Sequence, residues 1–236
     1  KRSYIYAQNM VFPRMYSSES RHIGEYNHWV GGIKGKKVPY DNCGQMVTVT
    51  VPTQLENLKF FFRYQVGFMY WRYFMWNFVG RQNDIQGHGE IENGNWITGI
   101  NFIDNKLVGG DQRILPEVYK GKGRNVFYGL PLILGIIGLC WQLGKGKKGT
   151  QQFWVVFSLF FMTGLAIVVY LNQTPLQPRE RDYAYAGSFY AFAIWIGMGT
   201  AAISEILRKI LGEKAAPILA FALTLLVPIQ MVGQTW

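Results

Sequence analysis

The sequence predicts a mainly α-helical, polytopic membrane protein with a polar extramembrane head. Three observations support this fold class. The chain of 236 residues is 49% hydrophobic and 16% aromatic but only 16% charged, whereas soluble domains carry about 25% charged residues. Four apolar runs follow residue 125, each close to the ~20 residues that cross the hydrocarbon core of a bilayer. A helix candidate over residues 53–79 is aromatic on nearly every face, which favours the membrane interface.

The net charge of +10 is compatible with nucleic acid or with anionic lipid as a partner. The apolar runs favour the lipid bilayer, with cations facing anionic headgroups, so no nucleic-acid partner is predicted. Cys43 and Cys140 lie far apart in different settings, and no Cys/His spacing is typical of zinc. We therefore predict no disulfide, no metal site and no firmly assigned cofactor. The chain does not begin with Met and ends directly after an apolar run, so we expect a piece of a longer protein.

Residues 1–52 form a polar, basic extramembrane segment in this prediction. The stretch Arg14–Trp29 is expected to form a short amphipathic helix that ends near Gly31, and residues 33–42 a loop or hairpin. Residues 46–51 alternate valine with polar side chains, which predicts a half-buried strand. The head should therefore contain a short β-hairpin.

Residues 53–79 should form one long aromatic helix. Thr53 and Glu56 have the spacing of a capping box, and Gly80 is expected to end the helix in the left-handed conformation. Gln65 and Arg72 are seven residues apart, which places them on one face of an α-helix. Because cations also occur on the opposite face, we predict an interfacial or re-entrant helix packed on other membrane helices rather than a simple span.

Residues 80–125 are predicted to be a long polar loop region, and residues 126–236 a bundle of four transmembrane helices. Small residues inside the apolar runs should allow close helix packing. The expected spans are 126–143, 153–171, 185–207 and 217–233, and the small residues are Gly135, Gly138, Gly164, Gly197, Gly199, Ala201 and Ala202.

The charges of the connections predict the orientation. The first and third connections are basic, whereas the second, residues 172–184, carries acids as well as arginines. Because basic connections favour the cytoplasmic side, the head and the second connection are expected to share the opposite side. Two polar clusters then face the same compartment.

The first cluster follows the aromatic helix. Arg81, Gln82, Asn83, Asp84 and His88 supply a cation, amides, a carboxylate and an imidazole, the groups that bind a phosphate and move a proton. The alternative interpretation is a helix-terminating loop with Asn/Asp turn chemistry and a solvated histidine.

The second cluster directly precedes the third predicted span. Arg179, Glu180, Arg181, Asp182 and Tyr183 alternate cations with acids, and arginine side chains can hold a lipid phosphate through paired hydrogen bonds. The alternative is a self-paired charge cluster at the membrane edge.

Several of these motifs resemble a known family. They are the runs YWRYFMWNF (70–78), GRQNDIQG (80–87), NW (95–96), NFID (101–104) and RERDY (179–183). The chain resembles, over nearly its whole length, the bacterial, Bacteroidetes-type membrane proteins formerly called domain of unknown function 2723. These are grouped as glycosyltransferase family 117, of GT-C type, and are related to a eukaryotic transmembrane protein O-mannosyltransferase.

The resemblance implies a GT-C-like fold and a transferase that uses a polyprenyl-phosphate-linked sugar as donor and a protein or glycan as acceptor. It implies the bacterial inner membrane, with the polar head on the periplasmic side. GT-C enzymes place a catalytic acid in an early outer loop, so the catalytic residue is expected outside this chain and is not assigned. Arg81, Arg179 and Arg181 are the expected phosphate contacts.

The expected sugar or acceptor contacts are the other polar side chains of the two clusters, Gln82, Asn83, Asp84, His88, Glu180, Asp182 and Tyr183. The competing hypothesis is a non-catalytic assembly or scaffold subunit of a membrane complex that binds a partner protein through its polar head.

Overall fold

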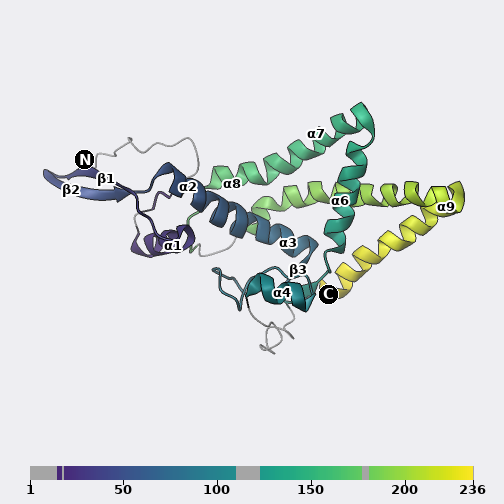
Figure 1. Ribbon diagram of the computed structural model, residues 1–236, viewed down its shortest axis with the longest axis horizontal. Coiled ribbons are helices and arrows are strands. Elements are labelled where there is room, and N and C mark those ends of the chain that lie inside the picture. The colour runs from purple at the N-terminus through teal and green to yellow at the C-terminus, as the bar shows by residue number, and fades with distance from the viewer. Residues whose placement is uncertain (1–14, 18, 110–122, 177–180, 236) are drawn as a thin grey trace.

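The computed structural model describes residues 15–17, 19–109, 123–176 and 181–235. Within them the protein is mainly helical, with two small antiparallel sheets, and it is elongated, with a head at one end and long apolar helices at the other (Figure 1). The helical elements are α1 (Ser20–Val30), α2 (Gln54–Phe60), η2 (Phe61–Trp71), α3 (Arg72–Phe78), α4 (Asn101–Val108), α6 (Leu130–Leu143), α7 (Gly146–Thr163), α8 (Leu165–Leu171), η3 (Asp182–Tyr185) and α9 (Ala186–Thr235). The strands are β1 (Lys36–Asn42), β2 (Gln45–Val51), β3 (Gly80–Arg81) and β4 (Asn125–Val126).

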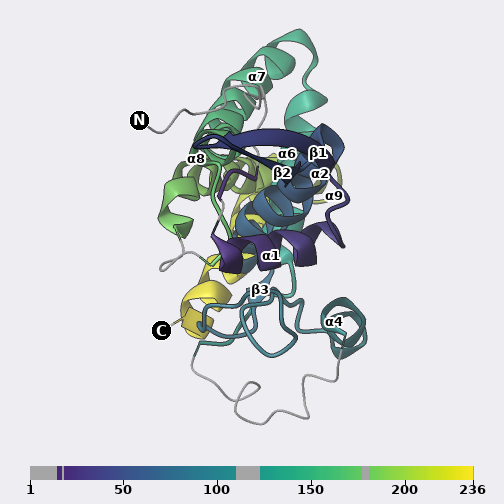
Figure 2. The same ribbon diagram turned by 90° about the vertical axis from the view of Figure 1, so that its left-hand side faces the viewer.

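The head contains α1 and the β1–β2 hairpin. Gly31 ends α1 in the left-handed conformation, as predicted. The hairpin is also confirmed, with Lys36 opposite Val51 and Asn42 opposite Gln45. The predicted half-burial of β2 is wrong, because its side chains are exposed on both faces apart from the partly covered Val51. In the view along the long axis, α1 lies between the hairpin and the segment that carries β3 and α4 (Figure 2).

The aromatic helix is continuous from α2 through η2 to α3. The predicted capping box is present: the Thr53 hydroxyl accepts from the Glu56 backbone N–H at 3.3 Å, and the Glu56 carboxylate accepts from the Thr53 N–H at 2.7 Å. The helix ends at Phe78. Gly80 does not cap it but starts β3 with φ 153°, where a Cβ atom would lie 2.7 Å from the Asn125 carbonyl oxygen.

The middle of this helix, η2, is a π-helix of 11 residues. π-helical segments are rare and mostly short, and they occur frequently at functional sites. A π-helix holds more residues per turn than an α-helix, so the prediction that Gln65 and Arg72 share a face is wrong. Gln65 contacts residues 172–173, whereas Arg72 contacts Gly94.

The helices α6 and α9 pack backbone against backbone through glycine. A Cβ atom on Gly138 would lie 1.9 Å from the Trp195 carbonyl oxygen, and one on Gly199 would lie 2.3 Å from the Leu134 carbonyl oxygen. The prediction of close packing through small residues is therefore confirmed at these positions. Gly197 is different, because nothing lies within 4 Å of its Cβ position.

The helix α9 contains a break at Gly212, whose φ of 76° and ψ of 175° are not helical. Its second half turns back along the first (Figure 1). The four predicted apolar segments fall on α6, on α7 with α8, and on the two halves of α9, although residues 126–129 and Gly164 are not helical. Two stretches, Gly146–Leu171 and Asp182–Thr235, are long and apolar enough to cross a membrane, and α6 is a shorter apolar helix.

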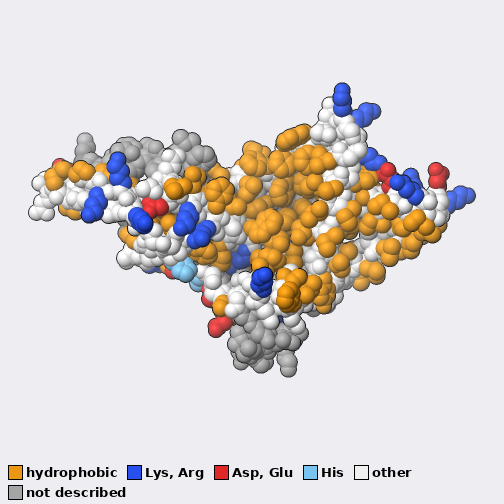
Figure 3. Space-filling view, viewed as in Figure 1, with side chains coloured by type: hydrophobic (Ala, Val, Ile, Leu, Met, Phe, Trp, Pro, Cys, Tyr) orange, Lys and Arg blue, Asp and Glu red, His pale blue; other side chains and the backbone are white. Residues whose placement is uncertain are grey.

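Few of the residues in these two stretches are buried within the protein. In the most apolar part of each stretch, 17% and 11% of the residues are buried. Apolar side chains cover the helices between the head and a tip rich in Lys and Arg (Figure 3). The α6–α7 connection and the break in α9 both lie at the end remote from the hairpin (Figure 1). Both basic connections therefore occupy one end of the molecule.

Candidate functional site

The loop that follows the aromatic helix is folded by two buried amide side chains. The Gln82 Oε1 atom accepts from the backbone N–H of Asn95 at 3.1 Å and from its Nδ2 at 2.9 Å, and Gln82 Nε2 donates to the Ile91 carbonyl at 2.8 Å. The Asn83 Oδ1 atom accepts from the Gly94 N–H at 3.0 Å. Both amides therefore fix the loop backbone, and their polar atoms face the loop interior.

Arg81, Asp84 and His88 lie at the margins of this loop. The Arg81 Nε donates to the Gly123 carbonyl at 3.0 Å, and its guanidinium carbon lies 5.6 Å from the centre of the Trp76 ring. Asp84 also lies against Gly123: a Cβ atom added to Gly123 would lie 2.5 Å from the Asp84 Oδ1. His88 and Asp84 are exposed, so both can reach a ligand from solvent.

Arg72 fastens the same loop to the aromatic helix, a role that sequence reasoning missed. The side chain is buried. Its guanidinium carbon lies 3.9 Å from the centre of the Phe68 ring, and its Nη1 donates to the Gly94 carbonyl at 3.1 Å. A cation over an aromatic ring is stabilised further when it is removed from water. Gly94 is favoured here, because its φ is 70° and a Cβ would lie 2.8 Å from the Gly87 backbone nitrogen as well as 2.8 Å from the Arg72 Nη1.

The second connection meets the π-helix through its first half. The Gln65 Nε2 atom donates to Asn172 Oδ1 at 3.0 Å and to the Gln173 carbonyl at 2.9 Å. The Tyr64 hydroxyl donates to the Thr174 carbonyl at 3.3 Å. These contacts hold residues 172–174 against the middle of the aromatic helix.

The second half of this connection carries the charged cluster. Arg181, Asp182 and Tyr183 are exposed, and Arg179 and Glu180 lie outside the described residues. Tyr185, at the end of η3, is buried with its ring centre 5.5 Å from that of Tyr70. The charged side chains therefore project from a segment that is anchored to the π-helix by Tyr185.

The loop of the first cluster approaches the second connection at a small cavity beside the π-helix, whereas none of the described residues of the second cluster lines this cavity. The cavity holds about 10 Å³, room for roughly one water molecule. Its walls come from the π-helix, from the loop of the first cluster and from the second connection: Tyr64, Phe68, Met69, Gln86, Gly87, His88 and Leu176. The structure thus brings His88 beside the second connection, whereas Arg81 is held at Gly123 and Trp76.

Three buried polar atoms at the joint between the π-helix and the second connection have no hydrogen-bond partner among the residues that the structure describes. They are Gln65 Oε1 and both side-chain polar atoms of Gln173. Leaving such atoms unpaired costs about 1–3 kcal/mol each. The joint therefore has hydrogen-bonding capacity that a water molecule or a polar ligand could use.

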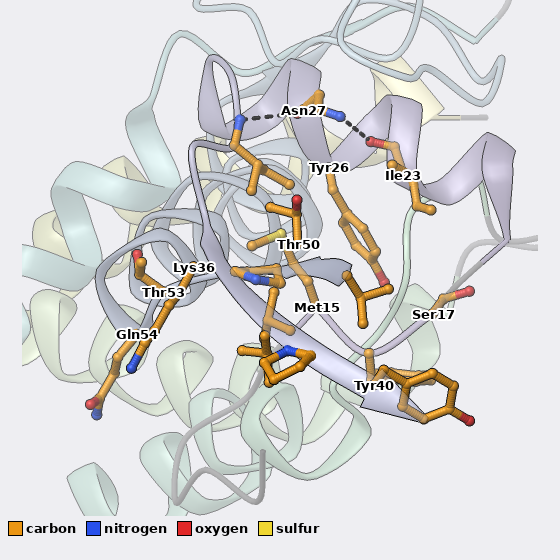
Figure 4. A pocket seen from close by; sticks show the side chains of 17 residues that line it. Met15, Ser17, Ile23, Tyr26, Asn27, Lys36, Tyr40, Thr50, Thr53 and Gln54 are labelled. Atoms are coloured by element: carbon orange, nitrogen blue, oxygen red, sulfur yellow. Dashed lines mark hydrogen bonds between the residues drawn. The ribbon is translucent and has the colours of Figure 1, made fainter. Parts of the chain in front are cut away.

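A much larger cavity, of about 930 Å³, lies in the head between α1 and the β1–β2 hairpin (Figure 4). Tyr26 is 3% exposed, and among the described residues its hydroxyl makes no hydrogen bond of standard geometry. Burial raises the pKa of Tyr26 to about 12, against the opposing effect of the nearby backbone amides of Ser17 and Tyr16. The wall is mostly apolar, with Met15, Ile23, Ile33, Val38, Pro39, Tyr40, Val49 and Val51, and Lys36 also lines it.

Sequence reasoning missed this cavity because its walls come from segments of the head that only folding brings together. The alternating valines of residues 46–51 were the available signal. They predicted an apolar sheet face, and the structure shows that this face borders open space.

Comparison with known proteins gives one match. Residues 1–62 match the model of a family described as a family of unknown function (DUF8416). No curated protein and no solved structure matches the chain. The matched stretch ends within the π-helix and includes every residue that lines the large cavity. The head, with its cavity, is therefore the part of the chain that is similar to a described family.

Proposed function

We propose that the chain is part of a GT-C-type glycosyltransferase of the bacterial inner membrane. It would move a sugar from a polyprenyl phosphate to a protein or glycan acceptor on the periplasmic face. The observation that carries the proposal is the cavity beside the π-helix, where the loop containing His88 meets the second connection at Leu176. The resemblance of both segments to the glycosyltransferase family supplies the chemistry.

The exposed apolar helices support a four-span arrangement. In a soluble protein, helices as apolar as α7 and α9 would be covered by the rest of the chain, whereas here most of their side chains are uncovered. The break at Gly212 divides α9 into two segments, each long enough to approach the ~20 residues of a span. The basic connections gather at one end (Lys145, Lys147 and Lys148, and Arg208, Lys209 and Lys214), which favours the cytoplasmic side there.

The proposed reaction is an inverting transfer. The acceptor hydroxyl attacks the anomeric carbon, the bond from that carbon to the phosphate oxygen breaks, and a carboxylate outside this chain takes the hydroxyl proton. Arg81, Arg179 and Arg181 would stabilise the charge on the departing lipid phosphate. Asp84 and His88, which are exposed at the loop margin, would contact the sugar or acceptor, together with the second connection's Glu180, Asp182 and Tyr183. Gln82 and Asn83 would act by holding the loop.

The test is sugar transfer from a radiolabelled polyprenyl-phosphate sugar in vesicles that contain the whole enzyme of which we propose this chain to be a part. Arg181→Ala should lower the rate by roughly 10²-fold, the effect of removing one group that stabilises transition-state charge. Arg208→Ala removes an arginine from the opposite end of the bundle and should leave the rate unchanged. Equal rates for both variants and the native protein would remove Arg181 from the site, and no transfer by the native protein would reject the enzyme.

A second candidate, a scaffold subunit that binds a partner protein, is favoured by the open cavity in the head. It predicts no sugar transfer in the same assay. It also predicts that the head retains its partner when the Arg181 side chain is removed.

A further inference from the structure

The β1–β2 hairpin has an apolar face that the described part of the chain leaves largely uncovered. The register places Lys36, Val38 and Tyr40 opposite Val51, Val49 and Val47 on one face. Val47 and Val49 are 44% and 42% exposed. An isolated two-stranded hairpin is marginally stable in water and gains stability from a third strand or a covering element. This hairpin therefore has a position for another element.

The two outer edges of the hairpin differ in their capacity to accept a further strand. Cys43 and Gly44 form a two-residue turn with φ of 55° and 90°, so Asn42 and Gln45 are a hydrogen-bonded pair. Hydrogen-bonded and non-hydrogen-bonded pairs then alternate along the ladder. Pro39 falls in a non-hydrogen-bonded pair, where a residue's N–H would point outward.

Proline has no N–H, so Pro39 blocks the outer edge of β1. On β2 the outward positions are Met46, Thr48 and Thr50, each with an N–H and a carbonyl. In the described part of the chain these groups have no backbone partner outside the hairpin. β2 also lacks charged residues, although exposed edge strands commonly carry lysine or proline to prevent pairing. The open edge is therefore that of β2.

The cavity of about 930 Å³ lies on the apolar face of this hairpin and gives side chains of an added strand a place to pack. Val49 and Val51 of β2 line it from one side, and Ile23 and Tyr26 of α1 from the other. The buried hydroxyl of Tyr26 supplies one hydrogen-bonding group inside it. Lys36 and Lys37 are exposed beside the C-terminal end of β2.

We propose that the outer edge of β2 and the cavity beside it bind an extended segment of another protein, which adds as a third, antiparallel strand. The segment pairs with the backbone of Met46, Thr48 and Thr50, and its alternate apolar side chains pack against the valine face. Its N-terminal end lies at the end of the sheet where β1 carries Lys36 and Lys37, one strand away across β2, so acidic residues there complement the charge. This interface goes beyond the proposed function and does not depend on it.

A second copy of this chain fits the edge poorly. The hairpin strands run broadly along the long axis of the molecule, as α8 and the first half of α9 do, whereas α6 crosses that axis (Figure 1). Two copies in one bilayer with the same orientation would therefore present their β2 strands in parallel. When two identical edges pair about a two-fold axis, the two strands must make the same hydrogen bonds. An antiparallel pair meets this condition, whereas the staggered bonds of a parallel ladder make its two strands inequivalent.

The probe is a fluorescein-labelled peptide of alternating valine and threonine with two glutamates at its N-terminus. Binding to the full chain in nanodiscs is measured by fluorescence anisotropy. We expect saturable binding, weakened about ten-fold by Thr48→Pro, which removes an outward N–H while sparing the bonds within the hairpin. Thr48→Val keeps the N–H and is the matched control with unchanged affinity. Two lysines in place of the peptide's glutamates should weaken binding several-fold.

A second measurement leaves the protein unaltered. N-methylation of alternate peptide residues should abolish binding when the methyl groups face β2, and should preserve it when they face away. Equal binding of both methylated series, or no binding of the parent peptide at 1 mM, would overturn the proposal.

Two other occupants give different results. A concentration-dependent dimer that Thr48→Pro abolishes, without peptide binding, would assign the edge to a second copy. Peptide binding only after deletion of residues 1–14 would assign it to that segment. Either result overturns the proposal.

Discussion

The substitution Gly138→Ala in α6 should force α6 and α9 apart, whereas Gly197→Ala in α9 should not. A Cβ atom on Gly138 would lie 1.9 Å from the Trp195 carbonyl oxygen and 2.6 Å from the Gly199 nitrogen. Both are helix backbone atoms, which cannot rotate away as a side chain can. The helices must therefore move apart, and overpacking of this kind costs about 1–3 kcal/mol.

Gly197 provides the matched control because nothing lies within 4 Å of its Cβ position. Both substitutions gain the same helix preference of alanine over glycine, about 1 kcal/mol. The difference in the free energy of unfolding between the two variants should therefore equal the overpacking cost alone. For a chain of this length 1 kcal/mol corresponds to roughly 2–4 °C in Tm, so Gly138→Ala should melt roughly 2–12 °C below Gly197→Ala.

The assay is thermal unfolding in detergent, followed by loss of the monodisperse peak in size-exclusion chromatography. If the two variants melt at the same temperature, the helices do not meet at Gly138 as the structure describes. A Gly138→Ala variant more stable than the native protein would lead to the same conclusion.

Two further predictions concern the head and the membrane. Burial acts to raise the pKa of Glu56, but hydrogen bonds from Thr53, Gly35 and Lys34 outweigh it and lower the pKa from 4.5 to about 2. The stability that Glu56 contributes is therefore present above pH 4.5 and is lost as the pH falls towards 2. The measurement is hydrogen exchange of residues 33–60, corrected for intrinsic rates, which should accelerate over this range. The control is Glu56→Gln, which should remove this pH dependence. In intact vesicles a membrane-impermeant maleimide should label the exposed Cys43 but not Cys140, whose exposed face on α6 would be covered by lipid.

Each of these two predictions has a result that contradicts it. Unchanged exchange between pH 5 and pH 2 in the native protein would show that the Glu56 hydrogen bonds do not hold the start of α2. Rapid labelling of Cys140 before detergent is added would place α6 in water rather than in lipid.

Local signals in the sequence predicted much of the helical structure. Thr53 and Glu56 were sufficient to predict the capping box, because both partners lie within one turn of the same helix. Gly31 correctly predicted the end of α1. The pattern failed at η2, where hydrophobic periodicity carries no signal for a π-helix among side chains that are nearly all aromatic.

The candidate site depended more strongly on contacts distant in the sequence. The residue types around Arg81 were identifiable from the sequence, but burial decided that Gln82 and Asn83 fold the loop. Arg72 was noticed as an interruption of the aromatic helix, and only its contact with Gly94 revealed its role. The meeting of His88 with Leu176 was equally hidden, because loop geometry sets it rather than any local pattern.

The sequence by itself determined the mainly helical class, the apolar segments, the hairpin, the start of α2 and the end of α1. Each follows from composition, periodicity or capping within a few adjacent residues. Only the tertiary structure decided which glycines bring α6 and α9 together, which polar side chains are buried, and where the hairpin leaves an edge and a cavity open. These features depend on distances between segments far apart in the chain, which side-chain packing and backbone hydrogen bonding fix only when the whole protein folds.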